Sequence, residues 1–330
     1  MNIRRTAFVG LVAFVALHDR SPADEPAAPA ADGTISVVVP STRTPTAPSA
    51  TEPPPQPLAT GPASELLSAA LEPLDARRAG DPGLYARPLS LLEALERSGD
   101  RTRRLWIAQA YWKLSTAFAA VRFAAEAVSR LELIAPGGDP HDRAALDVAA
   151  ADARADLAEA RAGLVTAQQE LVDLIRLPVS ETPPWPVDRP LATPYQTHFD
   201  AIFASRPATG RIRAIDRMLP SKHEAIEVRA AAVLAAKTAL EMVEADHAKG
   251  RRPIESVVAA QAMLAAQQRE FLAAALAYNL DIAEYAMSVA DASVADDRFV
   301  SMLIGTPIQW RGPGQVVPAG ATAPDASSSR

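Results

Sequence analysis

The chain has 330 residues, a net charge of −6, 29 prolines, 15 glycines and no cysteine. The missing cysteines exclude disulfides, thiolate zinc sites, a cysteine nucleophile and a lipid-modified amino-terminal cysteine, and the net charge gives no general attraction to nucleic acid. Eleven prolines lie between Pro22 and Pro62, whereas four long stretches further on have none. This composition argues against a β-sandwich or a doubly wound sheet and favours long alanine-rich helices.

Residues 1–20 have the layout of a secretory signal peptide. Arg4 and Arg5 precede an uncharged stretch, Thr6–Leu17, that is too short for a membrane span of about 20 residues. We therefore expect export, and a frayed hydrophobic terminus is the alternative. Residues 21–87 are rich in Pro, Ala, Ser and Thr, which predicts a disordered linker because such a segment buries little apolar surface.

Two long helices are predicted within residues 88–190. Thr102–Leu133 carries apolar residues at three- and four-residue steps, and a Gly- and Pro-rich break follows. Asp142 is the expected cap of the next helix. Along that helix the steps alternate between four and three, which is the 3.5-residue period of a coiled-coil seam. The seam positions are Leu146, Ala150, Ala153, Leu157, Ala160, Leu164, Ala167, Leu171 and Leu174.

Two further long helices are predicted within residues 191–305, after a short helical piece at Thr197–Ser205. The third long helix is expected to start near Ser221, because Ser221 and Glu224 match a capping box. The break that ends it contains Gly250, the natural residue for a left-handed helix stop.

The fourth long helix carries two sets of residues at steps of seven. One set forms the expected seam, and it consists of Val257, Leu264, Phe271, Tyr278 and Tyr285. The other includes Gln261 and Gln268, which are unfavourable in a dry core and predict a side that faces water or a neighbouring subunit. Residues 306–330 resemble the linker in composition and predict a disordered tail.

The two halves look like copies of one unit, since each has a long helix, a tight Gly- and Pro-containing break and a second long helix. Asp147–Val148 opens the second helix of the first unit much as Ser256–Val257 opens that of the second. We therefore predict an all-α fold of two long antiparallel coiled-coil helical hairpins in tandem, with residues 88–190 as the first and residues 191–305 as the second.

The second break and the helix after it resemble a motif of the TolC-like outer-membrane efflux proteins. That motif has the form G-x-x-[SP], two further residues, and [DS]-V-[LV]-x-A-Q. Arg206–Pro207 is similar to the family's Arg-Pro helix start, and Ala110–Trp112 is similar to the opening of its first repeat. The residues that match the motif are Gly250, Pro253, Ser256, Val257, Val258, Ala260 and Gln261.

The resemblance implies a homotrimer in which twelve helices surround a periplasmic tunnel. The hairpin tips would meet a periplasmic adaptor (membrane fusion) protein of an inner-membrane pump. The chain would then be an exported efflux component of the periplasm, associated with the outer membrane. The implied adaptor-docking residues at the tips are Gly138, His141, Lys249, Gly250, Arg251, Arg252, Pro253 and Ser256.

One departure from the family concerns the strands of its outer-membrane barrel. Each repeat of the family inserts a pair of membrane-spanning strands, which need about 9–11 residues of in/out alternation. Only Ser98–Asp100 and Leu219–Pro220 occupy the expected insertion points. The resemblance therefore implies the helical tunnel without these strands, and it does not explain how the chain would reach the outer membrane.

Two groups of charged residues allow two interpretations each. Asp152, Asp156 and Glu159 lie along one helix face, which is either a solvated face or an acidic tunnel lining that favours cations. The basic residues between 249 and 252 either complement the helix dipole or dock to an acidic adaptor surface.

No nucleophile elbow, phosphate loop or H-E-x-x-H motif occurs, and the five histidines lack metal-ligand spacing. We expect a protein without enzymatic activity, cofactor or bound metal. Two alternatives to the efflux component stay open. One is a structural periplasmic coiled-coil protein that keeps the fold but not transport, and the other is a cytoplasmic helical scaffold, if residues 1–20 are not a signal peptide.

Overall fold

A computed structural model describes residues 61–72, 87–135, 139–178, 180–290 and 294–304, and the backbone of residues 310–311 and 315–316. The chain divides into two units, Met1–Pro55 and Gln56–Arg330, and every described residue belongs to the second. The predicted signal peptide and most of the predicted linker and tail lie outside the described residues.

Helices make up most of the described chain, which confirms the prediction of an all-α fold. A short 3-10 helix, η2, spans Arg101–Arg103. The α-helices are α1 (Pro62–Leu71), α3 (Leu91–Ser98), α4 (Arg104–Leu133), α5 (Pro140–Ile175), α6 (Phe199–Ile202), α7 (Gly210–Ala248), α8 (Ile254–Val289) and α9 (Asp296–Ser301).

The described strands are short and form two separate pairs. β1 (Arg87–Leu89) pairs in parallel with β2 (Pro184–Pro186), and β3 (Trp310–Arg311) pairs antiparallel with β4 (Gln315–Val316). The second pair falls within the region predicted as a disordered tail, so the prediction is wrong for these residues.

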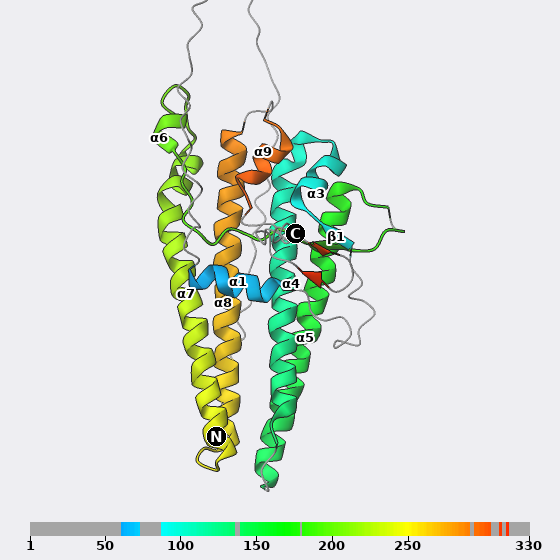
Figure 1. Ribbon diagram of the computed structural model, residues 1–330, viewed down its shortest axis with the longest axis vertical. Coiled ribbons are helices and arrows are strands. Elements are labelled where there is room, and N and C mark those ends of the chain that lie inside the picture. Colours follow the sequence, from blue (N-terminus) through cyan, green and yellow to red (C-terminus); the bar gives the residue numbers. More distant parts are fainter. Residues whose placement is uncertain are drawn as a thin grey trace, which may run out of the picture. The chain divides into compact units, whose positions relative to one another are not determined.

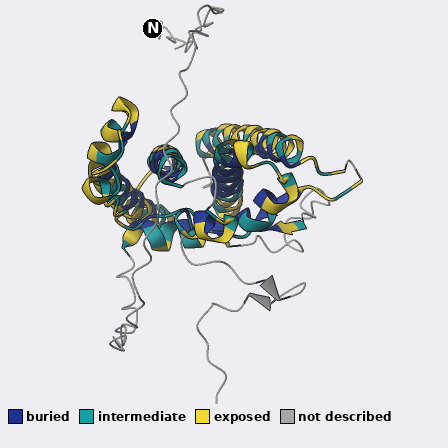
Figure 2. Ribbon diagram, turned by 90° about the horizontal axis from the view of Figure 1, so that it is seen from above, coloured by how far each residue is buried: buried dark blue, intermediate teal, exposed yellow. Residues whose placement is uncertain are grey.

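The four long helices lie side by side (Figure 1). α4 packs along α5, α7 packs along α8, and α4 also contacts α8. The end of α4, the start of α5 and the α7–α8 turn lie at the same end of these helices, which we call the tips (Figure 1). The buried residues lie mostly on the helix sides that face one another, and the exposed residues lie on the outer sides (Figure 2).

The start of α5 differs in detail from the prediction. The Asp139 carboxylate accepts a hydrogen bond from the His141 backbone N–H at 2.9 Å, so Asp139 and not Asp142 caps the helix. Pro140 then occupies the first helical position, where its missing N–H costs nothing because that N–H has no partner inside a helix.

The start of α7 lies about three turns before the predicted start at Ser221. The Thr209 hydroxyl caps the helix by accepting a hydrogen bond from the Ile212 N–H at 3.2 Å. Pro220 lies inside the helix and is exposed. Ile212 and Leu219 are buried, and their apolar contacts offset the backbone hydrogen bond that Pro220 cannot donate.

α1 corrects the prediction that all of residues 21–87 form a disordered linker. Its buried face includes Leu67 and Leu71, and it packs against both α4 and α7. At its start, the Ala63 N–H donates a hydrogen bond to the Glu227 carboxylate of α7 at 3.4 Å. The linker prediction missed this short amphipathic helix, because it rested on the Pro-rich composition of the whole region 21–87.

Residues 187–197, which we call the strap, connect β2 to the second half of the chain. The Asn279 side chain of α8 accepts a hydrogen bond from the Leu191 N–H at 2.8 Å and donates one to the Leu191 carbonyl at 2.9 Å. The Tyr278 hydroxyl donates to the Thr193 carbonyl at 2.8 Å. These contacts satisfy the polar backbone of an irregular segment, so the strap is fixed to α8 along its length.

A buried polar cluster holds the beginning of the strap to α4. The Tyr111 hydroxyl lies 2.9 Å from the Leu89 carbonyl oxygen and 3.1 Å from the Asp188 carboxylate, which also accepts the Leu91 N–H at 2.6 Å. Burial raises the pKa of Asp188, and burial followed by the Asp188 charge raises the pKa of Tyr111 well above its usual value. The cluster thus joins β1, α4 and the strap at the end of the helices away from the tips.

Candidate functional site

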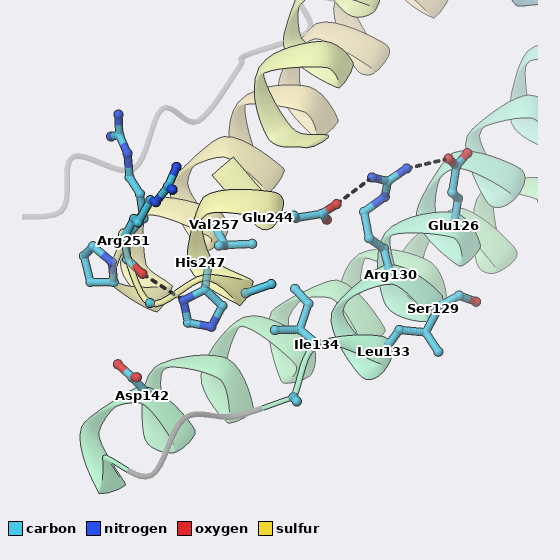
Figure 3. A pocket seen from close by; sticks show the side chains of 15 residues that line it. Glu126, Ser129, Arg130, Leu133, Ile134, Asp142, Glu244, His247, Arg251 and Val257 are labelled. Atoms are coloured by element: carbon cyan, nitrogen blue, oxygen red, sulfur yellow. Dashed lines mark hydrogen bonds and ion pairs between the residues drawn. The ribbon is translucent and has the colours of Figure 1, made fainter. Parts of the chain in front are cut away.

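A cleft of about 1280 Å³ separates the tips of the two helix pairs (Figure 3). Its walls come from the last two turns of α4, the first turn of α5, the end of α7 and the start of α8. We call it the tip cleft. Its position coincides with the region where the sequence predicted a docking site.

The α7–α8 turn has a well-defined backbone structure. The Arg251 N–H donates to the Asp246 carbonyl at 2.9 Å, and the Gly250 N–H donates to the His247 carbonyl at 2.8 Å. This pair of bonds is the Schellman motif, which requires a left-handed residue where Gly250 lies, at φ 69°. The left-handed stop expected at Gly250 is therefore present, and the turn holds its side chains in fixed positions.

His247 adds a side-chain bond across the same turn. Its Nδ1 lies 2.9 Å from the Arg252 carbonyl oxygen (Figure 3). Because a carbonyl oxygen only accepts, Nδ1 carries the proton in this arrangement. The bond closes the turn between the end of α7 and Pro253, which precedes α8.

One arginine links the two helix pairs across the tip cleft. Arg130 of α4 forms an ion pair with Glu244 of α7 at 3.2 Å and a second with Glu126 of its own helix at 3.5 Å (Figure 3). The Arg130 and Glu244 side chains are 21% and 25% exposed, so water screens the pair only in part. The other carboxylate oxygen of Glu244, Oε1, is buried and has no hydrogen-bond partner among the described residues.

The predicted docking residues divide into three groups. Gly250, Arg251, Arg252 and Pro253 line the tip cleft. Gly138 lies outside the described residues. The other three are described but do not line the cleft, and they are His141, Lys249 and Ser256.

The charged residues Glu126, Arg130 and Glu244 line the tip cleft and were not predicted as site residues. The four-residue spacing of Glu126 and Arg130 is a signal in the sequence that favours an ion pair within one helix. The partner on α7 is 114 residues away in sequence, so helix periodicity carries no signal for it.

The residues of the predicted seam lie mostly in the interior. In α5, Leu146, Leu164 and Leu171 are buried, whereas Leu157 is half-buried. In α8, all five residues of the expected seam are buried, namely Val257, Leu264, Phe271, Tyr278 and Tyr285. Gln261 and Gln268 are also buried within this chain, although a side that faces water or a neighbouring subunit was expected for them. They line a groove between helices, which explains how polar groups occur at these positions.

None of the described His, Asp and Glu side chains gather in groups of three or more that could hold a metal ion. Within the same part of the chain, no helix combines the length and apolar character needed to cross a bilayer. Comparison of the sequence with protein-family models and with curated proteins finds no match.

Proposed function

We propose that this chain is a TolC-like efflux component without enzymatic activity, in which α4–α5 and α7–α8 are two tandem copies of one antiparallel coiled-coil hairpin. Three copies would assemble side by side into a periplasmic tunnel. The tips would dock to a periplasmic adaptor of an inner-membrane pump. The observation that carries the proposal is the arrangement of two long helix pairs whose tips lie at one end and flank a charged cleft.

The burial pattern supports the coiled-coil part of the proposal. Residues at steps of seven in α8 are buried, and α4 packs against both α5 and α8. A period of seven keeps one stripe of a helix facing its neighbour over a long distance. A compact domain has little use for a 36-residue helix such as α5, which spans about 54 Å at 1.5 Å per residue.

The outward faces of α5 and α7 support side-by-side assembly. Val148 and Val165 on α5 are exposed, and so are Val228 and Met242 on α7. Exposed apolar residues on two helices at opposite edges of the four-helix body provide the two different surfaces that a ring of identical subunits needs.

The charge of the α7–α8 turn supports adaptor docking at the tips. Arg251 and Arg252 are exposed and line the tip cleft, and Lys249 is exposed beside them. The Arg251 side chain is only loosely paired with Asp246, at 3.8 Å. Exposed charges of this kind attract an acidic protein surface and favour encounter with it.

An efflux assay in a deletion strain tests this proposal. We expect the strain to lose tolerance to at least one toxic compound and to regain it with the natural chain. Arg251→Glu combined with Arg252→Glu should restore much less tolerance, because the tip would then repel an acidic partner. The control is Arg213→Glu combined with Arg217→Glu, which makes the same charge change on exposed positions of α7 far from the tips.

Three results of this assay have distinct meanings. Unchanged tolerance on deletion would contradict transport and favour the structural coiled-coil role. Equal loss with both double variants would contradict docking through the tip. Loss with the tip variant alone is the outcome that the proposal predicts.

A further inference from the structure

A second cavity lies between α4, α5 and α8, and none of its lining residues lines the tip cleft. Its volume is about 580 Å³, within the range of sites that bind small molecules. Alanines from all three helices form most of its floor, and Phe123, Leu131 and Leu272 add apolar surface. We call this cavity the acidic groove, because three carboxylates also line it.

One wall of the acidic groove carries a row of carboxylates. Asp152, Asp156 and Glu159 lie on α5 at spacings of four and three residues. At 1.5 Å per residue, successive carboxylates are about 6 Å and 4.5 Å apart along the helix axis. Arg269 of α8 is the one cation among the described lining residues. It contacts Asp156 at 3.6 Å while both side chains are more than half exposed, so this pair leaves the groove strongly negative.

A buried amide gives independent evidence for a ligand. Gln261 of α8 lines the acidic groove and is only 6% exposed. Its carbonyl oxygen, Oε1, is buried and has no hydrogen-bond partner among the described residues. Folded proteins leave few such atoms without a partner, because an unpaired buried acceptor is costly. A hydrogen-bond donor from a bound molecule would satisfy this atom.

The shape and chemistry of the groove narrow the class of ligand. The described carboxylates do not gather in a group of three that could hold a metal ion, and a row of separate charges suits a ligand with separate cationic centres. The alanine floor favours methylene groups between those centres. A helix of about 10 Å diameter would fill this volume in little more than one turn, so a helical peptide fits poorly.

We propose that the acidic groove binds a linear polyammonium ion with methylene spacers, that is, a polyamine. Its ammonium groups pair with Asp152, Asp156 and Glu159, its methylenes contact the alanines, and an N–H donates to the Gln261 carbonyl. The inference does not depend on the proposed tunnel or on adaptor docking, because every residue that carries it belongs to one chain.

Isothermal titration of the full chain with spermidine tests the inference. We expect one site per chain, whose affinity falls at least tenfold in the variant Asp152→Asn combined with Asp156→Asn. The control is Asp147→Asn combined with Asp173→Asn, which removes the same charge from exposed positions of α5 outside the groove. The control variant should bind spermidine with unchanged affinity.

A second variant and a competing ion separate a built site from general charge attraction. Gln261→Leu should weaken spermidine binding severalfold without lowering the melting temperature, because leucine replaces an amide whose carbonyl has no partner. Equal loss of affinity in the groove and control double variants would overturn the proposal. Displacement of spermidine by Mg²⁺ at equal concentration of charge would also overturn it, and so would binding of a basic helical peptide in place of spermidine.

Discussion

The two ends of the long helices are built differently. Away from the tips, Tyr111, Asp188 and Asn279 form buried hydrogen bonds that fix the strap and β1 to α4 and α8. At the tips, the helix pairs diverge around the tip cleft, and the link between them is a half-buried ion pair between Arg130 and Glu244. One end of the molecule therefore stabilises the fold, whereas the other leaves charged groups available for contact.

The sharpest test of this comparison uses one large apolar residue from each end. Trp112→Ala should lower the free energy of unfolding by about 4 kcal/mol, because Trp112 is 1% exposed and its removal leaves a cavity. Leu133→Ala at the tips should change it by less than about 0.5 kcal/mol, because Leu133 is 86% exposed. Urea denaturation measures both. Similar losses in the two variants would show that the ends contribute equally to stability.

High pH should weaken the strap end specifically. Burial raises the pKa of Tyr278 to about 12, whereas an unfolded tyrosine has a pKa near 10. The folded state therefore holds more protons between these values, so the stability present below pH 10 is lost as pH rises toward 12. We expect a loss of about 2 kcal/mol from this group, and a shallower pH dependence in Tyr278→Phe. An identical pH dependence in that variant would contradict the assignment.

Two glycines offer a matched pair of substitutions with opposite expected signs. Gly250→Ala at the tip should cost about 1 kcal/mol, because φ is 69° there and alanine disfavours this conformation. Gly163→Ala in the middle of α5 should stabilise the protein by about 0.5 kcal/mol, because the position is helical and nothing lies within 4 Å of the added Cβ. Thermal unfolding measures both variants. A loss at both positions would contradict the structure of α5.

A small effect is expected for the ion pair across the tip cleft. Arg130→Gln should lower the free energy of unfolding by less than about 1 kcal/mol, because Arg130 and Glu244 are both partly solvated. The effect should shrink further in high salt, which screens exposed charges. A loss of several kcal/mol would show that the tips are held together as firmly as the opposite end.

The sequence predicts the helices where turn residues lie close to the real boundaries. Gly250 and Pro253 fixed the α7–α8 turn, and the apolar period along α5 and α8 identified positions that are mostly buried. The start of α7 was missed because Ser221 and Glu224 match a capping box, although the helix already begins at Gly210 and buries Ile212 and Leu219. Turn residues and apolar periodicity therefore predict those helices whose boundaries are set by neighbouring residues in the sequence.

Contacts between distant segments could not be predicted from the sequence. Asn279 holds Leu191 across 88 residues, and Arg130 meets Glu244 across 114 residues. Neither pair leaves a periodic signal, because each depends on how the helix pairs pack together. The tip residues were therefore predicted only in part: Arg251 and Arg252 line the cleft, whereas the residues of its opposite wall were not singled out.

The central claim is that the helix pairs assemble side by side in three copies. Sedimentation equilibrium of the chain purified from the periplasmic fraction tests it most directly, in the absence and in the presence of an adaptor protein from the same genome. The account predicts a particle with three times the mass of one chain in at least the second condition. A monomer at every concentration in both conditions would contradict it.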